Sequence, residues 1–148
     1  MQDAAFLAEI ESAFPAKRLP PDAPVTAYVD EDTERQFAGT GWREHDPASI
    51  ASMTHSLSFF SPPALVHFLP AYLRAALLLA DSGVADALLA RLRPPKGDMT
   101  RPSFLRWWAL LDDSQRDVIC RIVARLAAPD DHDARALAAA TWRTDVPR

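Results

Sequence analysis

The side chains of this chain that could perform acid–base or metal chemistry are scattered along the sequence. Neither an i, i+4 pair of histidines nor an HExxH arrangement occurs, so no two imidazoles share a helix face as zinc ligands do. The run "PDDHD" at residues 129–133 is better explained as an acidic helix start, because consecutive helical side chains point in different directions. We therefore predict no metal site and no cofactor. The four histidines are His45, His55, His67 and His132.

Nucleophiles and phosphate-binding loops are equally poorly supported. No serine lies in a GxSxG elbow, and Cys120 lies close to the apolar residues Ile119 and Ile122 of a predicted helix, as a structural thiol does. The glycines of "GTGW", residues 39–42, lack the third glycine and the preceding strand of a dinucleotide fingerprint. The sequence therefore predicts no catalytic residue and no enzymatic activity.

One polar pair interrupts an otherwise apolar stretch. His67 and Arg74 are seven residues apart, which places them on the same helix face two turns from each other. Together with Tyr72 they could form a small anionic pocket or contact a partner. The alternative is a solvent-facing stripe on a core helix. The pocket interpretation would make the chain a small enzyme or a ligand-binding domain.

Acidic residues are concentrated in the first third of the chain. The net charge is −4, and residues 1–46 contain ten acidic against four basic residues. Such a surface argues against nucleic-acid binding, which depends on lysine and arginine, and suits a basic protein partner. Solvated acidic loops, with Trp42 and Arg43 anchoring them to the core, are the simpler alternative. The candidate partner-binding residues are Asp30, Glu31, Asp32, Glu34, Trp42, Arg43, Glu44 and Asp46.

The elements that must position these residues are helices. Apolar residues recur at helical spacing, while strand signals are nearly absent, so we predict one all-α domain over residues 1–148 with six to eight short helices. A proline-rich loop is expected over 15–29, with a possible short strand at 25–29, and a second loop over 94–101. Four helices are expected to begin at capping residues, namely Asp30 or Asp32, Asp46, Ser61, and Asp112 or Asp113.

The most apolar part of the chain is predicted to be a central core helix and not a membrane span. Residues 47–73 carry no formal charge, but Pro62, Pro63, Pro70 and Arg74 interrupt the roughly 20 apolar residues that a span requires. Helical spacing instead places a wide apolar face on this segment. Because proline in a helix interior costs about 3 kcal/mol, we expect a kink or a break into two helices at Pro70. The inward residues are expected to be Leu65, Phe68, Leu69, Tyr72, Leu73 and Ala76.

Three segments carry a resemblance to a known family. They are "GWREHDPASI", "HSLSFFSPPALVHFLPAYLRAALL" and "FLRWWALLDDSQRDVICRIVARL". In order and spacing they resemble a family of small bacterial proteins known only as a domain of unknown function, over roughly residues 1–127. This chain has Pro63 where the family has glutamate, and residues 113–115 depart from its Pro-Glu-Gln pattern. The resemblance implies no activity, cofactor or catalytic residue.

The leading hypothesis is a protein–protein interaction module. Its most concrete form is an immunity protein that binds and inhibits a toxin, and an accessory subunit is a further alternative. A single cysteine and an N-terminus without a basic and then apolar signal favour the cytoplasm. The sequence leaves the oligomeric state open.

Overall fold

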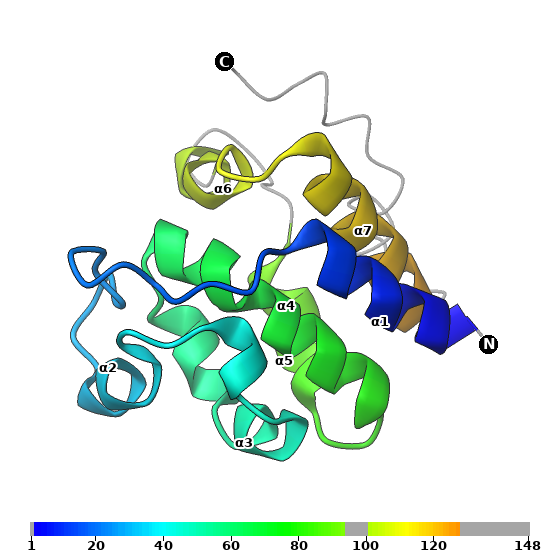
Figure 1. Cartoon of the computed structure of the whole chain (residues 1–148), viewed down its shortest axis with the longest axis horizontal. Helices are drawn as coiled ribbons and strands as arrows, with labels where there is room; N and C mark the ends of the chain where they lie inside the picture. Colours follow the sequence, from blue (N-terminus) through cyan, green and yellow to red (C-terminus); the bar gives the residue numbers. More distant parts are fainter. Residues whose placement is uncertain (1, 94–100, 128–148) are drawn as a thin grey trace.

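The computed structural model of the protein describes residues 2–93 and 101–127, which form seven α-helices and two short 3₁₀ helices. This confirms the all-α prediction. The expected last helix, with His132, and nearly all of the loop predicted over 94–101 lie outside the described residues. In chain order the elements are α1 (Gln2–Ala13), α2 (Glu31–Phe37), η1 (Trp42–Glu44), α3 (Pro47–Ala51), η2 (Thr54–Ser58), α4 (Pro62–Leu78), α5 (Val84–Arg91), α6 (Arg101–Trp108) and α7 (Asp113–Leu126) (Figure 1).

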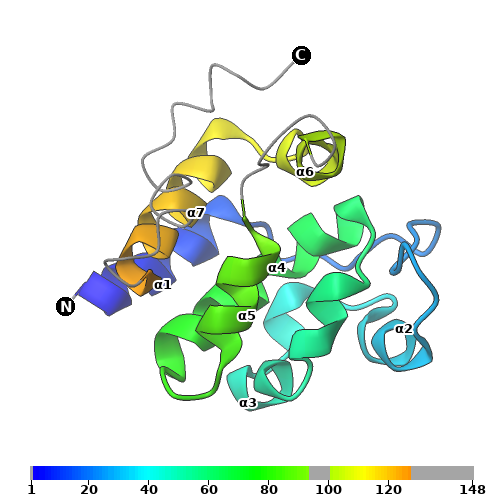
Figure 2. The same ribbon diagram turned by 180° about the vertical axis from the view of Figure 1, so that it is seen from behind.

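Helix α4 lies at the centre and the other elements pack around it. It contacts α1, α3, α5, α6, α7 and η1, while α1 and α7 pack against each other. Seen from front and back, α2 lies at the end of the molecule away from α1 and α7 (Figures 1 and 2). The predicted inward residues of α4 are all at most 1% exposed, which confirms its core face: Leu65, Phe68, Leu69, Tyr72, Leu73 and Ala76.

Of the two outcomes expected at Pro70, the division into two helices does not occur, because α4 runs as one helix from Pro62 to Leu78 with Pro70 inside it, and the kink stays a prediction. Proline removes one backbone hydrogen bond and crowds the preceding turn. Here residues on both sides of the proline are fully buried, including Leu69 and Ala71, and Pro70 itself is buried. Packing of the whole helix therefore outweighs the local cost of the proline.

The predicted helix starts are confirmed by their capping bonds. The carboxylates of Asp30, Asp46 and Asp112 and the hydroxyl of Ser61 each accept a bond from the backbone N–H three residues further on. Such bonds satisfy amides that have no partner within the helix. The Ser61 hydroxyl also donates to the Pro24 carbonyl over 2.6 Å, which ties the start of α4 to the proline-rich loop.

The short strand expected over 25–29 does not form within the part of the chain that is described. Thr26 pairs with Phe60 as an isolated bridge, flanked by Ala27 N–H donating to the Phe59 carbonyl and Ser61 N–H donating to the Val25 carbonyl. Pairing stops there because the opposite chain turns into α4 at Pro62. In the described ranges, no helix combines the length and apolarity needed to cross a bilayer.

Candidate functional site

The residues Tyr28–Glu34 form an exposed acidic segment at the start of α2, which we call the α2 patch. Tyr28 is 72% exposed and Val29 is 83% exposed, although both are large apolar side chains. They directly precede a segment with four acidic residues, of which Glu31, Asp32 and Glu34 are exposed. The patch thus places two exposed apolar groups beside several negative charges.

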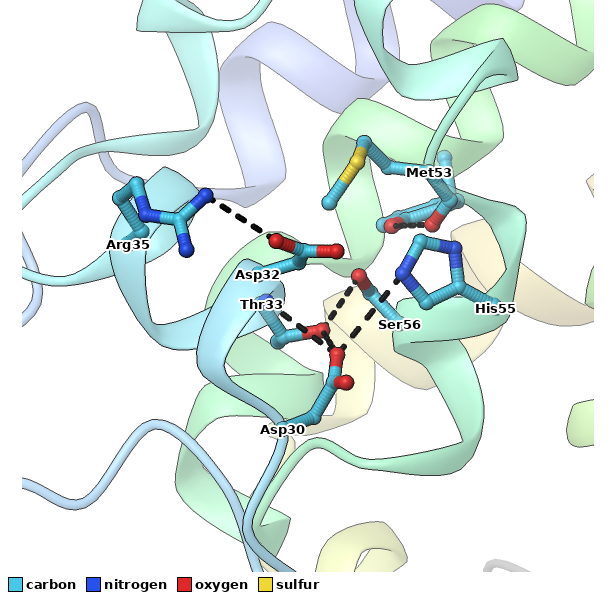
Figure 3. Close-up of polar contacts among 8 residues, drawn as sticks. Asp30, Asp32, Thr33, Arg35, Met53, His55 and Ser56 are labelled. Carbon is cyan, nitrogen blue, oxygen red and sulfur yellow. Dashed lines mark hydrogen bonds and ion pairs between the residues drawn. The ribbon is translucent and has the colours of Figure 1, made fainter.

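A buried hydrogen-bond network holds the α2 patch against η2 (Figure 3). Thr33 is fully buried, and its hydroxyl bonds both the Asp30 carboxylate and the hydroxyl of Ser56, the latter over 2.7 Å. The Asp30 carboxylate also accepts from the Thr33 backbone N–H and lies 3.7 Å from the His55 imidazole. Asp30 therefore positions the patch and has its carboxylate directed partly inward.

Tyr72 belongs to this side of the molecule and not to a pocket with His67. Its side chain is fully buried, and its hydroxyl donates to the Met53 carbonyl over 2.7 Å. Burial raises the pKa of Tyr72 well above its usual value, and a hydrogen bond with Ser56 opposes this shift. Tyr72 thus stays protonated and connects α4 to the segment that carries Ser56.

The remaining acidic candidates hold local structure to different degrees. Glu34 accepts from the Thr26 hydroxyl at 2.8 Å, and Asp32 pairs with Arg35 at 3.0 Å.

Glu44 accepts from the Gly41 N–H at 2.6 Å. Asp46 caps α3, and the hydrogen bonds that it accepts from Ser49 lower the pKa of its carboxyl. Most of the predicted acidic residues therefore have a structural task besides their charge.

Trp42 lies in the core, where the sequence left open whether it anchors the front segment or faces a partner. Only 1% of it is exposed, and the guanidinium carbons of Arg43 and Arg74 lie 5.3 and 5.1 Å from its ring centroid. Arg43 also pairs with Glu11 over 2.5 Å, which links η1 to α1. The indole and its two arginines therefore fasten η1 to the rest of the fold.

His67 and Arg74 lie on the same side of α4, as predicted, and both contact the segment 40–45. His67 Nε2 lies 3.2 Å from the Thr40 carbonyl, and Arg74 donates to the His45 carbonyl. Burial lowers the pKa of both His67 and His45 below that of a free imidazole. The polar stripe on α4 is thus the surface on which the segment 40–45 docks.

A surface pocket of about 200 Å³ opens beside His67. Neither Tyr72 nor Arg74 is part of its lining, so the three residues expected to share a pocket are separated. The walls come from the loop after α1, from η1, from the first turns of α4, from the connection between α6 and α7, and from the first turn of α7. The lining residues are Phe14, Pro15, Lys17, Trp42, Pro63, Val66, His67, Leu110 and Gln115.

Two features of the site were missed at the sequence level. The first is the buried contact between Thr33 and Ser56, which are 23 residues apart. The second is the exposure of Tyr28 and Val29. The sequence signal that could have indicated it is an apolar pair directly before a helix cap. Among the residues described, Cys120 is buried, and no three His, Cys, Asp or Glu side chains gather as metal ligands would.

Comparison with known proteins places the chain in a family without assigning a function. No curated protein and no solved structure matches the chain. A family model described as a family of unknown function, DUF6714, matches residues 23–144. That range contains the α2 patch, the docked segment 40–45 and all of α4. The chain therefore belongs to the DUF6714 family.

Proposed function

We propose that this protein is a protein-binding module that docks a basic partner on the α2 patch. The observation that supports this proposal is the exposure of Tyr28 and Val29, at 72% and 83%, directly beside acidic residues. Tyrosine is enriched at the energetic centres of protein interfaces, and an apolar centre with a polar rim is their common anatomy. Water contact with two such side chains is unfavourable, and a partner would relieve it.

The charges of the patch favour a basic partner. Asp30, Glu31, Asp32 and Glu34 are opposed within α2 by Arg35 alone, which pairs with Asp32. Uncompensated surface charge of one sign accelerates the encounter with a protein of opposite charge and fixes its orientation. The capped and buried Asp30–Thr33–Ser56 network keeps this segment preorganised, which lowers the entropy lost on binding.

The concrete partner class that we propose is a toxin, which the chain would neutralise in the cytoplasm by covering a basic active site. An acidic module with a preorganised apolar centre suits this role, because complementary charge steers it to a basic cleft and orients it there. The protein would then act as an immunity protein without catalysing a reaction. This proposal rests on the α2 patch and on no relative of assigned function.

The test is rescue of growth. The product of the gene next to this one is expressed from an inducible promoter in a bacterial host, with or without the present chain. Growth arrest by the neighbouring product and recovery with the wild-type chain support the proposal. Absence of toxicity, or arrest that the chain does not relieve, contradicts the toxin assignment.

Two substitutions connect rescue to the patch. Tyr28→Ala removes the apolar centre, and Glu31→Lys reverses an exposed charge, so both should weaken binding of the neighbouring product at least tenfold. A matched control is Leu78→Ala, which removes another exposed apolar side chain, 50% exposed, at the end of α4. If both patch variants bind the neighbouring product and rescue growth as the wild type does, the partner uses a different surface.

A further inference from the structure

The pocket beside His67 has a mixed lining of apolar side chains and polar groups, and Lys17 is the charged residue among them. Phe14 and Trp42 are almost fully buried in its lining, while Val66 is partly exposed and Leu110 is 52% exposed. We propose that this pocket is a binding site for a small carboxylate with a compact apolar body. The inference goes beyond the proposed interaction with a protein, because it concerns a different set of residues and a different class of ligand.

The polar groups of the lining differ in whether they are already engaged. The Gln115 amide donates to the Ala13 carbonyl over 3.1 Å, and its oxygen accepts from the Asp112 N–H over 3.0 Å. His67 Nε2 is engaged by the Thr40 carbonyl at 3.2 Å. These side chains are fixed by the fold and complete the wall of the pocket.

The Lys17 ammonium is the remaining charged group of the lining. Lys17 is exposed, and within the described part of the chain no carboxylate lies at ion-pair distance from it. The neighbouring Arg18, in contrast, pairs with Glu44 at 3.5 Å. The pocket therefore presents one uncompensated positive charge, which selects an anion over a cation or a neutral compound of the same shape.

The volume limits the size of the ligand. About 200 Å³ is below the roughly 300–1,000 Å³ of sites for drug-sized ligands, so the pocket suits a single ring or a short branched chain. Contact with Val66 and Leu110, the apolar side chains of the lining that are at least partly exposed, would cover the apolar body. A carboxylate would meet Lys17 in partial contact with water.

The experiment compares three probes of nearly the same shape and different charge. Benzoate, benzylamine and benzyl alcohol are titrated into the ¹⁵N-labelled full chain at low ionic strength, and amide shifts are followed by NMR. We expect saturable shifts at Val66, His67 and Leu110, with benzoate binding at least fivefold more tightly than benzylamine. Equal affinities, or the absence of saturable shifts at these residues, would overturn the proposal.

Variants separate the charge from the cavity. Lys17→Gln, at an exposed position, should weaken benzoate binding roughly fivefold and leave benzyl alcohol unchanged, because a partly solvated ion pair contributes about 1 kcal/mol at most. Arg18→Gln is the matched control, since it removes the adjacent charge outside the lining, and should change benzoate affinity less than twofold. An unaltered benzoate affinity in Lys17→Gln would contradict the assigned role of the ammonium. These results are independent of the rescue assay, so the two proposals fail separately.

Discussion

The guanidinium carbon of Arg74 lies 5.1 Å from the centroid of the Trp42 indole ring, over its face. The same guanidinium donates to the His45 carbonyl, so one side chain of α4 holds both ends of η1. Trp42 lies in η1 and Arg74 lies in α4, and α3 and η2 separate these two elements along the chain. This contact explains why an arginine is retained on a helix that is otherwise almost entirely apolar.

Arg74→Met should destabilise the fold by about 2 kcal/mol. Methionine keeps most of the apolar stem but loses the cation–π contact and the hydrogen bond to His45, each worth on the order of 1 kcal/mol. The free energy of unfolding is measured by urea denaturation. Arg35→Met, which removes a 65% exposed arginine paired with Asp32, is the control and should change it by less than about 0.5 kcal/mol. A similar small change in both variants would show that Arg74 does not fasten η1.

Thr33→Val should cost about 1–3 kcal/mol, because it leaves the buried Ser56 hydroxyl without the partner now 2.7 Å away. Adding Ser56→Ala should cost less than the sum of the two single changes, since removing both partners leaves fewer unsatisfied groups. A double-mutant cycle from urea denaturation gives the coupling energy. Thr54→Val, a nearby change in η2, is the control. Additive losses would mean that the two hydroxyls do not interact.

The stability should fall on acidification through the range just below neutrality. Burial lowers the pKa of His45 and of His67 from the ordinary 6.5, so near and below that pH the unfolded chain binds more protons than the folded one. The contribution of the neutral imidazoles is thus present above about pH 6.5 and is lost as the pH falls toward the folded pKa. Urea denaturation between about pH 8 and pH 5.5 measures the slope. His67→Gln and His45→Gln should each flatten it, and an unchanged slope in the double variant would assign the effect elsewhere.

Two glycines of the segment before η1 should respond differently to substitution by alanine. A Cβ at Gly41 would lie 2.9 Å from the Lys17 carbonyl oxygen, so Gly41→Ala should cost about 1–3 kcal/mol through a clash with backbone. Gly39 has a φ of +68° with open space around it, so Gly39→Ala costs about 1–2 kcal/mol through its conformation alone. Gly39→Asn, which tolerates that conformation, should recover part of the loss, whereas Gly41→Asn should not. Thermal denaturation compares the four variants, and equal recovery at both positions would contradict this distinction.

Local patterns predicted those parts of the fold that depend on residues within about one helical turn. Asp46 before Pro47 and Ser61 before Pro62 identified two helix starts, because a cap bonds an amide only three residues away. The apolar spacing of α4 likewise predicted its buried face. Local rules failed for the strand expected over 25–29, which is reduced to one bridge, and for the division of the helix at Pro70, where burial of the surrounding helix outweighed the loss of a backbone bond.

For the candidate site, the sequence by itself determined the acidity of the first third, the helical character of the elements, and the position of His67 and Arg74 on one side of α4. Only the tertiary structure decided that this side is covered by the segment 40–45 and that Thr33 meets Ser56. It also decided that Lys17 lines a pocket and that Tyr28 is exposed. The physical reason is range. Caps and periodicity act over three to four residues, whereas these contacts join residues far apart in the chain and exist only after the helices have packed around α4.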